Sequence, residues 1–285
     1  MLHTIQHILL RDTVILTSAL ALEASTARIE VQCLLQKILD VPRVYLFAHP
    51  ERSLTDTEFT HYSELLQRRL HGEPIAYILG EREFYGLNLK VTPATLIPRP
   101  DTELLVELAV QRIPTGERCT VLDMGTGSGA IALAIAHACP KAEVLACDAS
   151  ATALAVAQEN ARALGIANVS FVQSDWFAAL GTRRFTLIVS NPPYITAGDP
   201  HLAQGDVRFE PVSALVSGRD GLDDIRHIIT RSSSHLLPGG WLLLEHGYDQ
   251  AARVRGLLQE AEFDDVFSAC DLAGIERVSG GRIRT

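Results

Sequence analysis

The sequence predicts an α/β protein in which a doubly wound, mainly parallel sheet of seven strands follows a small bundle of helices. The first observation is that short apolar segments alternate with helical segments from Cys119 onward, which is typical of a parallel sheet covered by helices on both faces. The second is that no glycine precedes Gly72, while apolar residues recur there with helical spacing. The third is the alternating, aromatic-rich segment 83–91, which predicts a β-hairpin between the two regions.

The N-terminal domain, residues 1–73, is predicted to be entirely helical. An early helix is expected over about residues 4–19, and Thr55 with Glu58 has the spacing of a capping box, at which a helix begins. Apolar residues recur at i, i+3, i+4 and i+7 on one face of another helix: Val31, Leu34, Leu35 and Ile38. We assign this domain to recognition of a partner, and a role in packing or solubility is an equally open alternative.

Residues 74–98 are expected to form the connector, and residues 99–285 the sheet domain. Asp101 or Thr102 can cap a helix that ends near Arg112. Seven strands are predicted, the last of them as an edge strand: 120–123, 143–147, 169–172, 185–190, 240–245, 266–270 and 276–282.

The composition limits the possible functions. The chain has 285 residues and a formal net charge of −9, which disfavours a protein that holds nucleic acid mainly through phosphate contacts. Its five cysteines are odd in number and lack the spacing of a metal knuckle, so we expect free thiols and no metal site. No apolar run approaches the about 18 residues of a membrane span. We expect a cytoplasmic, monomeric protein that contacts neither membranes nor nucleic acid.

A glycine-rich segment joins the first strand of the sheet to its helix and has the features of a cofactor loop: Gly125, Thr126, Gly127, Ser128 and Gly129. Glycines allow a tight turn and a close approach of the backbone to a ligand, and the helix start offers free N–H groups. Asp148 ends the second strand, where it can accept both hydroxyls of a ribose. This pattern fits a nicotinamide dinucleotide as well as S-adenosylmethionine.

Two further features favour S-adenosylmethionine. Asp123 precedes the glycines, and a carboxylate suits a cationic amino-acid ligand better than a pyrophosphate. Asp175 and Trp176 follow the third strand, where the carboxylate can accept the adenine amino group and the indole can cover the purine. A place in the core is the alternative for Trp176.

The segment Asn191-Pro192-Pro193-Tyr194 follows the fourth predicted strand at the carboxyl edge of the sheet, where ligands bind in open α/β folds. Together with the glycine loop and Asp148, it makes the chain resemble the class I S-adenosylmethionine-dependent methyltransferases, which have a Rossmann-like sheet. The enzymes with this turn methylate a nitrogen conjugated to a planar π system, which is N6 of adenine, N2 of guanine or the side-chain amide of glutamine.

Further motifs narrow the resemblance to one family. The segments 84–86 (Phe-Tyr-Gly) and 98–103 (Pro-Arg-Pro-Asp-Thr-Glu), together with the helical N-terminal domain, are similar to those of release factor glutamine methyltransferases over nearly the whole chain. The resemblance implies that the partners are peptide chain release factors. Their Gly-Gly-Gln glutamine would be methylated at N5, S-adenosylmethionine would become S-adenosylhomocysteine, and translation termination would be modulated.

The resemblance also implies roles for individual residues. The Asn191 side-chain oxygen and the Pro192 carbonyl would each accept one N–H of the substrate amide, and Tyr194 would stack on that amide. These three are the expected catalytic residues, and Pro193 joins them in binding the substrate. The expected cofactor-binding residues are Gly125, Thr126, Gly127, Ser128, Gly129, Asp148, Trp176 and Asn191.

Three other functions remain open on the residues alone. A nucleic-acid amino-methyltransferase would share the Asn-Pro-Pro-Tyr turn, although the acidic balance and helical N-terminal domain favour a protein substrate. A nicotinamide oxidoreductase and a protein that only binds the cofactor are the other two. In all of the methyltransferase hypotheses, Arg99 and the loop 209–211 are expected to help close the pocket.

Overall fold

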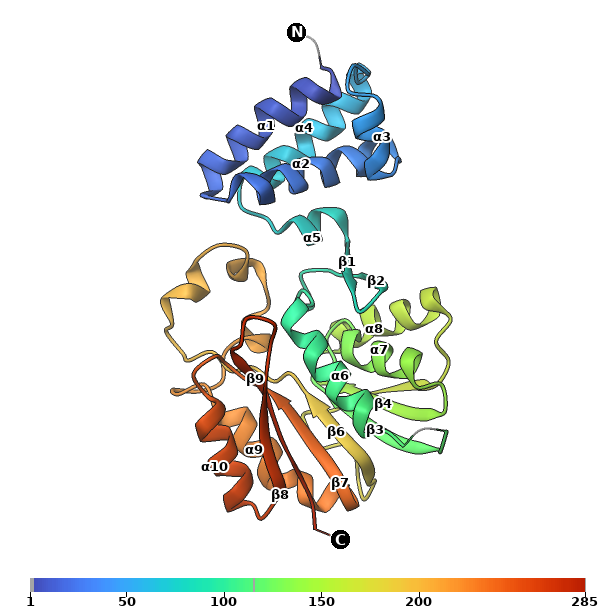
Figure 1. The fold of residues 1–285 in the computed structure, drawn as a ribbon, viewed down its shortest axis with the longest axis vertical. Coiled ribbons are helices and arrows are strands. Elements are labelled where there is room, and N and C mark those ends of the chain that lie inside the picture. Colours follow the sequence, from blue (N-terminus) through green and yellow to red (C-terminus); the bar gives the residue numbers. More distant parts are fainter. Residues whose placement is uncertain (1–2, 115, 285) are drawn as a thin grey trace. The chain divides into compact units, whose positions relative to one another are not determined.

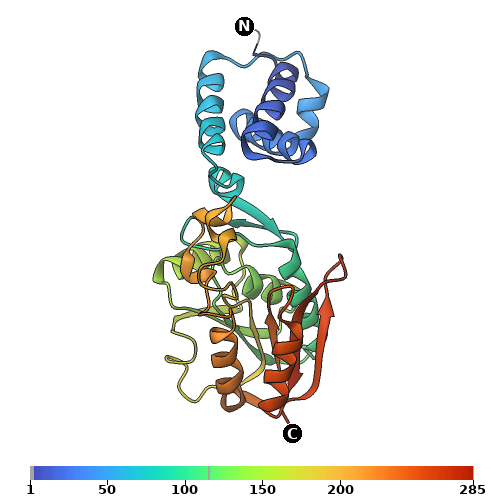
Figure 2. The ribbon, with the colours of Figure 1, turned by 90° about the vertical axis from the view of Figure 1, so that its left-hand side faces the viewer.

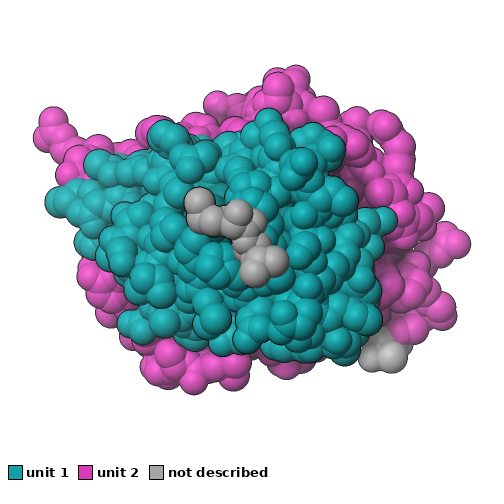
Figure 3. All heavy atoms as spheres, turned by 90° about the horizontal axis from the view of Figure 1, so that it is seen from above, with its two compact units in different colours: residues 1–81, 200–209 teal, residues 82–199, 210–285 magenta. Residues whose placement is uncertain are grey.

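The computed structural model describes residues 3–114 and 116–284, which form two compact units (Figure 3). The first unit contains the described residues up to Glu81 together with the segment 200–209, and the second contains the remainder. None of the helices in the described ranges has the length and apolar character required to cross a membrane.

The first unit is a bundle of helices (Figures 1 and 2): α1 (Ile5–Leu20), α2 (Ala24–Leu39), α3 (Arg43–Ala48), α4 (Asp56–Leu70) and α5 (Ile75–Leu79). The capping box is present at the start of α4, where the Glu58 amide donates to Thr55 and the Glu58 carboxylate accepts from the Thr55 amide. The unit continues past the expected boundary at residue 73, because Ile78 of α5 packs in the same apolar core. The short helices α3 and α5 were not predicted.

The second unit begins with the predicted hairpin, β1 (Glu81–Phe84) and β2 (Leu87–Lys90). Its turn places Tyr85 at φ +51° and Gly86 at φ +76°. Two residues with positive φ are typical of the tight turns that join right-twisted strands. The Phe84 side chain is buried in the core of the sheet unit.

The sheet has seven strands: β3 (Cys119–Met124), β4 (Ala142–Asp148), β5 (Val169–Gln173), β6 (Phe185–Ser190), β7 (Leu236–Glu245), β8 (Asp264–Cys270) and β9 (Glu276–Arg282). Their order is β5-β4-β3-β6-β7-β9-β8, and the first five in this order are parallel. The predicted fold class is confirmed. The prediction that β9 lies at an edge is wrong, because β9 pairs with β7 and with β8, and β8 is the edge strand.

Helices cover both faces of this sheet (Figure 1): α6 (Glu103–Arg112), α7 (Ala130–Ala138), α8 (Ala151–Leu164), α9 (Asp223–Ser232) and α10 (Ala251–Glu260). Alternate strand residues face opposite sides, so that Val121 packs with α6 and α7 whereas Leu122 packs with α9 and α10. Both faces of the strands are therefore apolar, and polar side chains concentrate where the strands end.

Candidate active site

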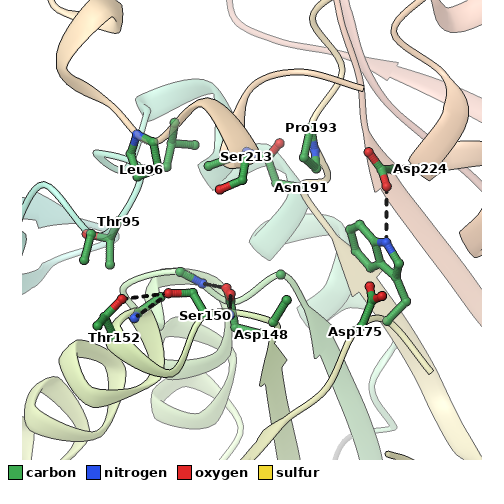
Figure 4. A pocket seen from close by; sticks show the side chains of 18 of the residues that line it. Thr95, Leu96, Asp148, Ser150, Thr152, Asp175, Asn191, Pro193, Ser213 and Asp224 are labelled. Carbon is green, nitrogen blue, oxygen red and sulfur yellow. Dashed lines mark hydrogen bonds between the residues drawn. The ribbon is translucent and has the colours of Figure 1, made fainter. Parts of the chain in front are cut away.

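A cavity of about 540 Å³ lies at the carboxyl edge of the parallel strands (Figure 4). Its walls come from the loops that follow β3, β4, β5 and β6, from the segment 93–96 and from the loop before α9. The cavity brings together six of the predicted site residues: Gly125, Gly127, Asp148, Trp176, Asn191 and Pro193. This is the edge at which doubly wound folds bind their ligands.

The glycine loop turns sharply at the end of β3. The amides of Gly125 and Thr126 both donate to the Cys147 carbonyl at 2.9 Å, which ties the loop to β4. Gly125 (φ +71°) and Gly127 (φ +55°) adopt left-handed conformations and line the cavity. Thr126 and Ser128 are buried and do not line it, and Gly129 instead allows the close packing of α7 on α8.

Asp123 is fully buried beneath this loop and does not line the cavity. Its Oδ2 atom accepts hydrogen bonds from Thr126 Oγ1 at 2.6 Å and from the Ala132 amide at 3.2 Å. Burial raises the pKa of Asp123 to about 7. Asp123 therefore does not reach the cavity, contrary to the expected direct contact with a cationic ligand. Its side chain instead stabilises the glycine loop through these two hydrogen bonds.

Asp148 at the end of β4 lies in the cavity wall (Figure 4). Its Oδ2 atom accepts from the Gly127 amide, and its Oδ1 atom accepts from the Ser150 amide, both at 2.9 Å. These bonds fix the carboxylate plane. Each oxygen keeps a second lone pair, so the group can still accept hydrogen bonds from a diol.

Trp176 lines the cavity next to Gly125, whose added Cβ would lie 3.8 Å from the indole. The indole Nε1 donates to Asp224 Oδ1 at 3.2 Å, as the dashed line in Figure 4 marks. The Trp176 backbone has φ +46°, which is unusual for a bulky residue and is typical of strained functional positions. Asp224 was not predicted, because it follows Trp176 by 48 positions.

The Asn-Pro-Pro-Tyr turn is divided between the cavity and the core. Asn191 and Pro193 line the cavity, and the Asn191 Nδ2 atom donates to Thr102 Oγ1 at 3.2 Å. Pro192 is buried, and its side chain does not line the cavity. Tyr194 also lies outside the cavity wall, packs against the core beside α9 and α10, and donates its hydroxyl to Glu245. The stacking of Tyr194 on a substrate stays a prediction.

Arg99 and Glu210 form an ion pair of 2.5 Å in which the Glu210 carboxylate is buried. The pair ties the segment before α6 to the loop that continues into Pro211, a residue of the cavity wall. Thr102 and Glu245 were missed by sequence reasoning. The signal for Glu245 was available, because it ends an apolar strand as Asp148 does.

Known proteins resemble the chain along nearly its whole length. Residues 100–206 match the Methyltransferase small domain family, and residues 16–80 match the PrmC N-terminal domain family. The release factor glutamine methyltransferase of Salmonella typhimurium is 50% identical over 260 residues, 91% of this chain and 94% of that protein. The chain belongs to the release factor glutamine methyltransferase family. The member from Escherichia coli K12 is 49% identical over 262 residues, 92% of this chain and 94% of that protein.

Two solved structures share the fold. The T. Thermophilus 16S rRNA N2 G1207 methyltransferase, determined with AdoMet and guanosine, is 24% identical with a TM-score of 0.53 and covers 72% of this chain and 50% of that chain. A methyltransferase from Pyrococcus furiosus is 18% identical with a TM-score of 0.54 and covers 78% of this chain and 100% of that chain. These likenesses agree with a methyltransferase sheet and indicate nothing about the substrate.

Proposed function

We propose that the chain transfers a methyl group from S-adenosylmethionine to the side-chain N5 of the glutamine in the Gly-Gly-Gln motif of peptide chain release factors. The observation that carries the proposal is one cavity that joins the glycine loop, Asp148 and Trp176 to Asn191. Membership in the release factor glutamine methyltransferase family supports the same substrate and does not support a nucleic-acid substrate.

The residues of the cavity fit S-adenosylmethionine. Asp148 offers a fixed carboxylate to the ribose diol, the Trp176 indole offers a face to the purine, and the backbone of Gly125 and Gly127 gives close access. The bound cofactor supplies an electrophilic methyl group on a sulfonium. Thr126, Ser128 and Gly129 would contribute by shaping the loop.

The substrate nitrogen needs orientation rather than a strong base. An amide nitrogen shares its lone pair with the carbonyl and is therefore a weak nucleophile. Asn191 Oδ1 and the Pro192 carbonyl would accept its two N–H groups, which holds the nitrogen in place and favours the positive charge that develops on it. Orientation of this kind lowers barriers by up to about 7–11 kcal/mol. After transfer the methylated nitrogen would carry the positive charge that the sulfonium has lost, which makes its N–H acidic, so the proton would pass to water.

The helical unit is proposed to recognise the release factor, with the protein acting as a monomer. Its exposed surface carries large apolar side chains that suit a protein partner: Leu10, Val14, Ile29, Val44 and Phe47.

The test is incubation of the full chain with S-adenosylmethionine and an unmethylated release factor, followed by mass spectrometry of the Gly-Gly-Gln peptide. We expect one added methyl group on the glutamine. Parallel reactions with tRNA, rRNA and DNA use tritiated cofactor. Label that enters only nucleic acid would refute the proposal, as would methylation of the release factor at another residue.

A further inference from the structure

A chain of polar side chains lies behind Asn191, between the ends of β6 and β7. Asn191 Nδ2 donates to Thr102 Oγ1 at 3.2 Å, and the Tyr194 hydroxyl donates to Glu245 Oε1 at 3.4 Å. The Thr102 hydroxyl also interacts with the Glu245 carboxylate and lowers its pKa. Glu245 is only 2% exposed and does not line the cavity, so it cannot touch a substrate there.

The direction of these hydrogen bonds follows from the chemistry of the carboxylate. An ionised carboxylate has acceptors only, so the Tyr194 hydroxyl donates to Glu245, and the Thr102 hydroxyl can interact with the carboxylate only as a donor. The Thr102 oxygen then has its lone pairs free for the Asn191 NH2 group. This leaves the Asn191 oxygen as the atom that can face the cavity.

The opposite orientation of Asn191 would be unproductive. An amide side chain turned by half a rotation presents two N–H donors, which repel the N–H donors of a substrate amide. Nothing within Asn191 itself selects one orientation, because its oxygen and nitrogen ends have nearly the same shape. The selection must come from its neighbours.

We propose that Glu245 is a positioning residue of the methyl transfer, which acts through Thr102 to hold the Asn191 oxygen toward the methyl-accepting nitrogen. The proposal rests on the proposed function of the site. Burial, with a smaller contribution from the nearby Asp101, raises the pKa of Glu245 to about 7. That value already includes the opposing effects of Thr102, Arg277 and Tyr194.

The matched variants are Thr102→Val and Glu245→Gln. Valine keeps the shape of threonine and removes the hydroxyl, while glutamine places an NH2 donor where the carboxylate had only acceptors. Both variants are expected to lower kcat about 10- to 100-fold, because a misplaced orienting group can cost that much. Affinity for S-adenosylhomocysteine should stay within about 2-fold, since neither residue lines the cavity. The double variant should be no slower than the slower single variant.

The control is Thr186→Val, which makes the same substitution near the start of β6, away from Asn191. There the Thr186 hydroxyl oxygen accepts a hydrogen bond from the Thr120 amide. It should leave kcat unchanged. A pH profile supplies a readout that a purely structural role would not alter. In the unaltered protein kcat should fall as the pH drops through about 7, since protonated Glu245 can donate to Thr102 and compete with Asn191. This fall of kcat at low pH should be absent in Glu245→Gln.

Two results would overturn the proposal. If Thr102→Val keeps the full kcat of the unaltered protein, the role of Glu245 is refuted and the proposed function is not. This result decides the matter whether or not Glu245→Gln folds. Absence of turnover by the unaltered protein on every glutamine substrate overturns the proposed function and this inference with it.

Discussion

The two ends of the cavity are positioned by different interactions. At the proposed cofactor end, the backbone does most of the positioning: the amides of Gly125 and Thr126 share one carbonyl, and the Gly127 amide holds Asp148. At the proposed substrate end, Asn191 is held by a side chain 89 positions away in the sequence, that of Thr102. The cofactor end therefore depends on which backbone conformations the local residues permit, and the substrate end depends on distant partners.

The largest effect should come from Gly129→Ala, which tests the end of the cavity that backbone groups position, called here the backbone-built end. Gly129 has φ +85°, and a Cβ there would lie 3.1 Å from both Ala157 Cβ and Leu133 Cδ1. Strain and overpacking together should lower the free energy of unfolding by about 2–4 kcal/mol. Urea unfolding followed by tryptophan fluorescence measures this, because both tryptophans, Trp176 and Trp241, lie in the sheet unit.

Gly127→Ala is the matched control for that change. Gly127 also has a positive φ, +55°, yet an added Cβ would meet no atom within 4 Å. Only the conformational cost remains, about 1–2 kcal/mol. Equal losses in the two variants would show that backbone conformation alone, without packing of α7 on α8, determines the stability of the loop.

Asn191→Ala tests the other end of the cavity, which distant side chains position. Removal of one acceptor frees the substrate amide to rotate, so kcat should fall about 100-fold, equivalent to about 2.7 kcal/mol. Affinity for S-adenosylhomocysteine, measured by calorimetry, should change little if Asn191 acts mainly on the substrate. A large loss of that affinity with normal kcat would assign Asn191 to the cofactor end instead.

The same difference explains what the sequence could and could not predict. The parallel strands and the glycine loop were predictable because their signals are local, as continuous apolar runs and as glycines at a strand end. The place of β9 was not predictable from Gly280 and Gly281, which weaken a strand signal. Their small size is what admits β9 beside β7, since a Cβ on Gly280 would lie 2.6 Å from the Leu242 carbonyl oxygen. The contact of Thr102 with Asn191 joins residues 89 positions apart in the sequence, and no local pattern encodes it.

The pH dependence of stability tests the support beneath the cofactor loop. Asp123 has its pKa raised by burial from its ordinary value near 4 to about 7, so the folded state binds a proton that the unfolded state has released. Stability from this group is therefore lost as the pH rises from 5 to 8, on the order of 2 kcal/mol. Asp123→Asn should show a smaller loss over this range. An unchanged pH dependence in the variant would contradict the assignment.

Asp271 is an acidic side chain whose pKa is shifted in the direction opposite to that of Asp123. Asp271 accepts hydrogen bonds from the amides of Ala273 and Ile275, which together with Arg277 hold its pKa below the ordinary range. Its stabilising contribution is present above that range and is lost as the pH falls toward the lowered pKa. Asp271→Asn should therefore lose stability at pH 8, whereas the change at Asp123 should make stability less sensitive to a rise in pH from 5 to 8.

Asp224→Asn should give the smallest effect, because it alters a side-chain interaction within the backbone-built end. The Asp224 carboxylate accepts from the Trp176 indole, and loss of this charge-assisted bond weakens the orientation of the ring by about 1 kcal/mol. Affinity for S-adenosylhomocysteine should fall about 5-fold while kcat at saturating cofactor stays unchanged. Asp223→Asn, at the neighbouring exposed carboxylate that pairs with Arg226, should leave the affinity unaltered. A lower kcat in Asp224→Asn would show that orientation of Trp176 also affects the substrate end, and the two ends would then be coupled rather than separate.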